Sequence, residues 1–133
     1  MTTIPAQPPL VPVSWGELLD KITILEIKVE RLTAQPARAN VVRELGQLRE
    51  VAHAIAHNAD TAPLVARLKA VNETLWEVED NIRDHERSRK FDSSFVDLAR
   101  SIYRLNDERA ALKRALNLAF GSTIIEEKSY NPY

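Results

Sequence analysis

The residues best suited to chemistry form a polar strip along two predicted helices in the second half of the chain. They are Trp76, Glu79, Asp80 and Arg83 on one helix and Arg100, Tyr103 and Asn106 on the next. The aromatic rings could stack on a ligand, the arginines could bind its negative charge, and the acids could bind its hydroxyl groups. The strip therefore predicts a site for a small anionic or sugar-like ligand.

The same strip has a structural interpretation. A turn centred near Phe91 would place Glu79 across from Tyr103 and Trp76 across from Asn106. Polar groups in such positions often form a network that fixes the register of packed helices. Both interpretations stay open at this point.

Arg109 interrupts an apolar stripe, where a charged side chain needs a partner. We expect a structural ion pair with Glu26 of the first helix, with Glu79 as the second choice. Alternatively, Arg109 extends past the edge of the core to solvent.

Carboxylates at helical spacing offer a weaker metal hypothesis. Glu77 and Asp80 form one E-x-x-D step, and Glu17 and Asp20 form another. This pattern resembles the all-helical nucleotide pyrophosphohydrolases, which implies magnesium-assisted attack on a phosphoanhydride. His53 lies four residues from His57, but without a third histidine nearby we expect both to face solvent. We expect no metal and no cofactor, and no catalytic residue can be named.

Two long apolar stripes must position the strip. Both follow alternating steps of three and four residues, which place each set on one face of an α-helix and are typical of coiled-coil-like packing. The stripes are Leu64, Leu68, Val71, Leu75, Val78 and Ile82, then Phe95, Leu98, Ile102, Leu105, Leu112 and Leu116. They predict a helical hairpin over residues 64–120 with its turn near residues 88–94, ended by Gly121.

The rest of the chain supplies two more helices and two extended ends. Residues 1–13 form a proline-rich arm, and Ser14 with Glu17 predicts a capped helix start. This first helix is apolar on two sides, so it is either central or half of a dimer seam. A lighter helix is expected over residues 37–58, and residues 122–133 form a tail. The fold class is all-α: an antiparallel four-helix bundle, residues 14–121, closed by the second helix.

Composition narrows the functional class. The 133 residues carry a formal net charge of −1, which gives no field that recruits nucleic acid. No apolar run is long enough to span a membrane, and no secretory signal is visible. The chain has no cysteine, which excludes disulfides and thiolate catalysis. We expect a cytoplasmic protein.

Four segments carry a family resemblance: residues 17–28, 75–83, 95–113 and 126–130. They are similar to a small all-helical family of uncharacterised proteins from bacteria and phages, a domain of unknown function. The resemblance implies no activity. Its members occur near genes for surface-sugar assembly, which implies an accessory role in cell-surface glycan assembly.

Together these observations favour a non-enzymatic interaction or accessory module. We expect a homodimer, because of the two apolar sides of the first helix, and an unidentified protein partner or small anionic ligand. The alternative is a ligand-binding protein or an enzyme acting on a phosphorylated or anionic small molecule through the polar strip. A binding module should have its strip paired within the chain, whereas an enzyme should have acids and arginines converging unpaired in a pocket.

Overall fold

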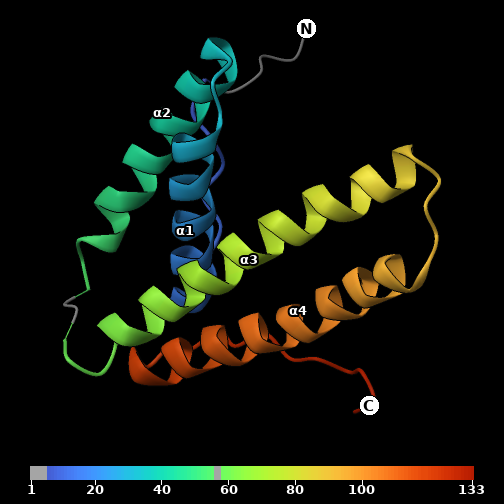
Figure 1. Ribbon diagram of the computed structural model, residues 1–133. Helices are drawn as coiled ribbons and strands as arrows, with labels where there is room; N and C mark the ends of the chain where they lie inside the picture. Colours follow the sequence, from blue (N-terminus) through green and yellow to red (C-terminus); the bar gives the residue numbers. More distant parts are fainter. Residues whose placement is uncertain (1–5, 56–57) are drawn as a thin grey trace, which may run out of the picture.

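The computed structural model describes residues 6–55 and 58–133, and within these ranges the chain forms four helices and no strand (Figure 1). The helices are α1 (Trp15–Arg31), α2 (Gln35–Ala52), α3 (Ala62–Arg87) and α4 (Ser93–Ala119). The predicted all-α class with four helices is confirmed. Among the described helices, none combines the length and the apolar character that a membrane crossing requires.

The helix start predicted at Ser14 and the helix end predicted at Gly121 are confirmed. Ser14 is the N-cap of α1, and its hydroxyl accepts a hydrogen bond from the Glu17 backbone N–H at 3.1 Å. The Glu17 carboxylate does not complete a capping box, because it pairs with Lys113 instead. Asp92 caps α4 by accepting hydrogen bonds from two backbone N–H groups. Gly121 follows α4 with φ +65°, a backbone conformation that glycine adopts without strain.

The second helix is shorter than predicted: α2 ends at Ala52 rather than at Asn58. The Asn58 side chain accepts hydrogen bonds from the backbone N–H groups of Asp60 and Thr61, at 2.8 and 3.0 Å. Such bonds favour a turn over a helix. Residues 56 and 57 of the predicted helix, like residues 1–5 of the arm, lie outside the described residues.

The first helix is the centre of the fold. α1 packs against α2, α3 and α4, and α3 and α4 lie side by side in opposite directions (Figure 1). No Cα atom of α2 comes within 8 Å of a Cα atom of α3 or α4. The expectation that α2 closes a bundle against the hairpin is therefore wrong, because α2 packs on α1 alone. Both apolar sides of α1 face other helices of the chain, so they no longer argue for a dimer seam.

The core occupies only the part of α3 and α4 that α1 crosses. Leu68, Val71 and Leu75 of α3 and Leu112 and Leu116 of α4 are buried against α1. Beyond Leu75 no residue of α3 is buried, and none before Leu112 is buried in α4. The distal parts of both helices therefore pack mainly on each other, and their apolar stripes stay half-buried.

Candidate functional site

A solvent-open groove of about 490 Å³ lies where α1 crosses the α3–α4 pair. We call it the junction groove. Its walls are Ile24 and Ile27 of α1, Asn72, Leu75, Trp76, Glu79, Asp80 and Arg83 of α3, and Asn106 and Arg109 of α4. This volume lies within the range of small-molecule sites.

The structure brings together most of the predicted strip. Trp76, Glu79, Asp80, Arg83 and Asn106 all line the junction groove. These side chains share it because steps of three and four keep them on the flank of α3 and α4 that faces α1.

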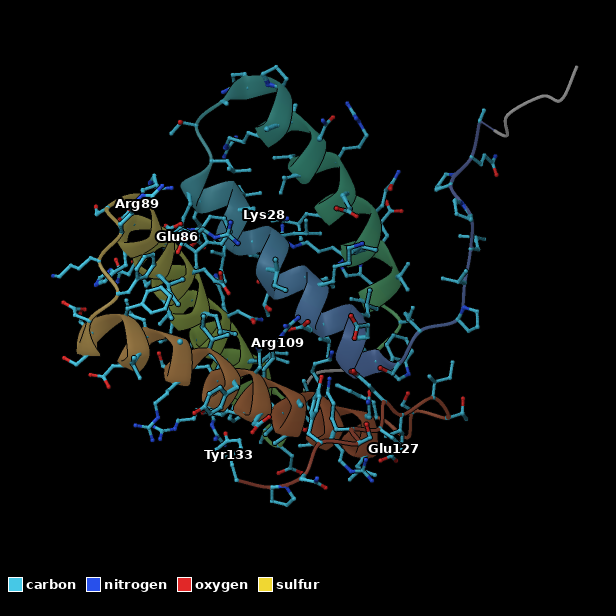
Figure 2. All side chains as sticks on the ribbon, turned by 90° about the vertical axis from the view of Figure 1, so that its right-hand side faces the viewer. Lys28, Glu86, Arg89, Arg109, Glu127 and Tyr133 are labelled. Atoms are coloured by element: carbon cyan, nitrogen blue, oxygen red, sulfur yellow. The ribbon has the colours of Figure 1, made fainter. Side chains whose placement is uncertain are left out.

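Two members of the predicted strip lie elsewhere. Tyr103 lines a separate cavity of about 510 Å³ beside the C-terminal tail, where its ring meets that of Tyr133 at 5.0 Å in an edge-on contact. Arg100 is exposed on α4 and does not line the groove. The tail runs back along α4, with Glu127 near its start and Tyr133 at its end (Figure 2). Sequence spacing gave no means of placing this tail.

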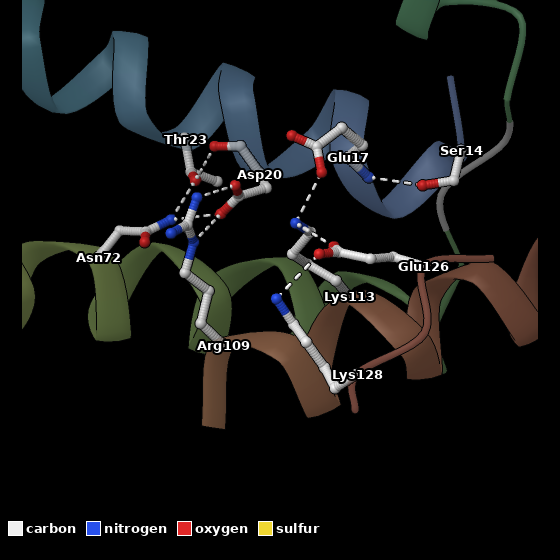
Figure 3. A network of polar contacts seen from close by, with 9 residues as sticks. All are labelled: Ser14, Glu17, Asp20, Thr23, Asn72, Arg109, Lys113, Glu126 and Lys128. Atoms are coloured by element: carbon white, nitrogen blue, oxygen red, sulfur yellow. Dashed lines mark hydrogen bonds and ion pairs between the residues drawn. The ribbon is translucent and has the colours of Figure 1, made fainter. Parts of the chain in front are cut away.

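The floor of the groove rests on Asp20, which is 1% exposed. The Arg109 guanidinium donates to both carboxylate oxygens of Asp20, through Nε to Oδ1 at 2.9 Å and through Nη2 to Oδ2 (Figure 3). Asn72 Nδ2 donates to Asp20 Oδ1 and to Thr23 Oγ1, both at 2.9 Å. The Thr23 hydroxyl in turn donates to the Asp20 backbone carbonyl at 2.7 Å. These contacts fix α1, α3 and α4 to one another.

The predicted Glu26–Arg109 pair is therefore wrong. Glu26 instead accepts from Arg49 of α2 at 2.8 Å, and the second choice, Glu79, pairs with Arg83 at 3.4 Å. Glu26 lies six positions after Asp20, which places the two side chains about 120° apart around the axis of α1. Glu26 faces α2, whereas Asp20 faces the α3–α4 pair.

The electrostatics of Arg109 follow from this contact. The hydrogen bond to Asp20 raises the pKa of Arg109 above its ordinary value, although partial burial opposes the shift. Arg109 is thus held as a cation whose charge is balanced by its partner.

A second charged cluster joins α1, α4 and the tail. Lys113, whose side chain is 12% exposed, contacts the Glu17 carboxylate at 2.6 Å and the Glu126 carboxylate at 3.2 Å (Figure 3). Burial is the largest single effect on the pKa of Lys113 and lowers it, but the hydrogen bonds that Lys113 donates to both carboxylates, together with their negative charges, raise the pKa on balance. Glu126 also pairs with Lys128 at 2.8 Å. This cluster ties the tail to the helices.

Sequence reasoning missed the role of Asp20, Asn72 and Lys113. The available signal for Asp20 was its position: with Thr23 and Ile27 it lies on one face of α1, at steps of three and four. A carboxylate on a face that also carries a buried isoleucine indicates a paired group.

The weaker metal hypothesis raised by the E-x-x-D steps finds no support among the described residues. Among the described residues no group of three or more histidine, cysteine, aspartate and glutamate side chains could hold a metal ion. Glu77 is engaged by Arg31 at 2.5 Å, and Glu17 is engaged by Lys113. His53 is exposed, and His57 lies outside the described residues. The pyrophosphohydrolase interpretation therefore finds no magnesium ligands here.

Comparison with known proteins identifies a family whose function is unknown. No curated protein matches the chain, and no solved structure matches it. A family model described as "Family of unknown function (DUF6165)" matches residues 10–133, which is almost the whole chain. The chain therefore belongs to the family of unknown function DUF6165.

Proposed function

We propose that the chain is a non-enzymatic binding module that holds an occupant in the junction groove and acts as an accessory to another process. One observation carries the proposal: both arginines of the groove, and one of its two lining acids, are already paired within the chain. Arg109 is held by Asp20, and Arg83 is paired with Glu79. The groove is thus preformed, which lowers the ordering cost of binding.

The same pairing argues against catalysis. General acid–base chemistry needs a titratable group within hydrogen-bond reach of the reacting atoms. Asp20 is buried beneath Asn72 and Arg109, so it cannot contact a substrate without breaking the floor. Of the acids lining the groove, only Asp80 has no hydrogen bond or ion pair with another described residue. A single exposed carboxylate, with no second acid or base directed at it, is suited to binding.

A thermal-melting screen coupled to mass spectrometry tests the proposal. The melting temperature of the purified chain is measured with sugars, with nucleotides and magnesium, and with dicarboxylates. Two variants are measured in the same way: Trp76→Ala in the groove, and Gln47→Ala, an exposed residue of α2, as the control. A compound at a hundredfold excess over its dissociation constant stabilises the chain by about 2.7 kcal/mol. We expect the stabilisation to vanish in Trp76→Ala only, and the compound to be recovered unchanged.

Two results of this screen separate the possibilities. If wild type converts the compound into a product, and a groove variant that still folds does not, the chain is an enzyme and the proposal is refuted. A compound that stabilises wild type and Trp76→Ala equally would place binding outside the groove.

A protein occupant is tested by photo-crosslinking in cells. A benzophenone side chain at position 80 faces the groove, and one at position 47 serves as the control on α2. Crosslinking to one partner from position 80 alone supports a groove-bound protein. Equal crosslinking from both positions speaks against it.

We include a homodimer in this proposal, on new grounds. The distal parts of α3 and α4 carry half-buried apolar stripes. Two further apolar side chains in this part of the chain are exposed to solvent, Phe91 by 57% and Val96 by 51%. A second copy that packed there would remove this apolar surface from water. Light scattering after size-exclusion chromatography is expected to give a mass twice that of the 15.1 kDa chain. The Val96→Asp variant is expected to have the mass of a single chain.

A further inference from the structure

We infer that the junction groove binds a carbohydrate ring that is neutral or carries an amine, and that it rejects phosphorylated ligands. This inference rests on the proposed function, because it names the chemical class of the occupant of the same groove. It replaces the anionic ligand that the sequence pattern suggested. Three properties of the groove carry it: one aromatic wall, a floor that both donates and accepts hydrogen bonds, and the sign of its uncompensated charge.

The aromatic wall is the Trp76 ring. Trp76 is part-buried and lines the groove together with the apolar side chains Ile24, Ile27 and Leu75. The Arg31 guanidinium, which does not line the groove, lies over the same ring at 5.8 Å from its centroid and helps to fix it. A pyranose ring has one face of C–H groups, which a flat, rigid indole can cover without losing much side-chain entropy.

The floor presents hydrogen-bond atoms of both kinds. Asn72 is 5% exposed and uses its Nδ2 on Asp20 and Thr23, so only its Oδ1 is left to accept. That oxygen is not sealed from solvent, since no fully buried side-chain oxygen or nitrogen among the described residues lacks a partner. Arg109 uses Nε and Nη2 on Asp20, which leaves Nη1 to donate. A sugar hydroxyl donates and accepts at once, and therefore matches such a mixed set.

The charges of the groove disfavour phosphate. The positive charge of Arg109 is balanced by Asp20, and that of Arg83 by Glu79. Asp80 is left as the uncompensated group, so the groove has a negative balance. A phosphate would be repelled by Asp80 and could bind Arg83 only in competition with Glu79, whereas a neutral hydroxyl or an ammonium group can donate a hydrogen bond to the Asp80 carboxylate.

The chain carries its own control for a direct test. It has two tryptophans, and Trp15 packs on Phe120 at 6.5 Å between ring centroids, away from the groove residues. Indole N–H signals of ¹⁵N-labelled chain are followed by NMR during titration with glucose, glucosamine and glucose 6-phosphate at equal ionic strength. We expect the Trp76 signal to shift with glucose and more strongly with glucosamine, and the Trp15 signal to stay in place. Glucose 6-phosphate should leave both signals unmoved.

A matched pair of variants tests the charge argument. Asp80→Asn should reduce the preference for glucosamine over glucose about fivefold, the effect of one charge pair at 4 Å in a water-like medium. Asp97→Asn, an exposed acid on α4 outside the groove, should leave that preference unchanged.

Each remaining outcome overturns a stated part of the inference. A Trp76 signal that stays still with all three compounds at millimolar concentration refutes the carbohydrate class. A glucose 6-phosphate response as strong as that of glucose refutes the charge argument. If a different compound or a crosslinked protein occupies the groove in the earlier tests, the proposed binding function survives while this inference fails.

Discussion

Replacing Arg109 by leucine should show how much the buried Asp20 carboxylate depends on its partner. The substitution keeps much of the side-chain volume but removes both hydrogen bonds to Asp20, which is 1% exposed. An uncompensated buried charge costs about 3–5 kcal/mol. A domain of this size has a stability of about 5–15 kcal/mol, so Arg109→Leu should consume a large share of it.

A double-mutant cycle separates the stranded charge from other effects. Asp20→Ala leaves Arg109, 29% exposed, able to reach water, so we expect a cost of about 1–3 kcal/mol. In the double variant no charge is stranded, and we expect it to be no less stable than Arg109→Leu alone. The coupling free energy should then be at least the cost of Asp20→Ala alone, about 1 kcal/mol or more.

Urea unfolding followed by circular dichroism measures all four proteins, with comparable denaturant slopes as the check that unfolding stays two-state. Arg49→Leu is the control, because its pair with Glu26 is exposed and worth less than about 1 kcal/mol. A loss below about 1 kcal/mol for Arg109→Leu, or costs that simply add in the double variant, would refute a buried, coupled pair.

Three further predictions follow from the packing. Gly16→Ala should destabilise the chain by about 1–3 kcal/mol, because a Cβ there would lie 2.8 Å from Asn117 Oδ1. At Gly46 a Cβ would meet no atom within 4 Å, so Gly46→Ala should stabilise the chain by about 0.5–1 kcal/mol. Thermal melting of both variants beside wild type checks this order. Leu45→Ala should cost about 2–5 kcal/mol and raise amide exchange first in α2, since Leu45 is the most buried side chain that fixes α2 to α1. Hydrogen bonds from Lys128 and Lys113 lower the pKa of Glu126 below its ordinary 4.5. Its contribution is therefore complete above pH 4.5 and is lost as the pH falls through the lowered value, so the stability gap between wild type and Glu126→Gln should close in acid.

Local signals in the sequence were enough to predict the four helices and some of their ends. Ser14 and Gly121 act where short-range chemistry alone predicts them, because a cap depends on residues within one turn. The end of α2 was misplaced because an alanine-rich stretch continues the helical pattern, while Asn58 starts a turn through its own side chain.

The partner of Arg109 was beyond local reasoning. α1 is apolar on two sides, and the sequence does not show which side the α3–α4 pair takes. Choosing the wrong side exchanges Asp20 for Glu26, since each lies on a different face of the helix. The groove residues, in contrast, sit on one flank of α3 at regular spacing, so Trp76 and Arg83 could be grouped without knowing the third helix.

The central position of α1 also sets the order in which the chain can fold. α1 with α2, and α3 with α4, are pairs of neighbours in sequence, whose association closes only short loops and is fast. The two pairs meet only through α1, across contacts such as Asp20–Arg109 and Gly16–Asn117, separated by 89 and 101 residues. Loop closure over such distances makes docking the slow event. If the Asp20–Arg109 contact is already formed in the folding transition state, Arg109→Leu should lower the refolding rate. If the contact forms only after the transition state, the substitution should instead raise the unfolding rate. The effect of this one substitution on the two rates therefore reports when the two helix pairs dock.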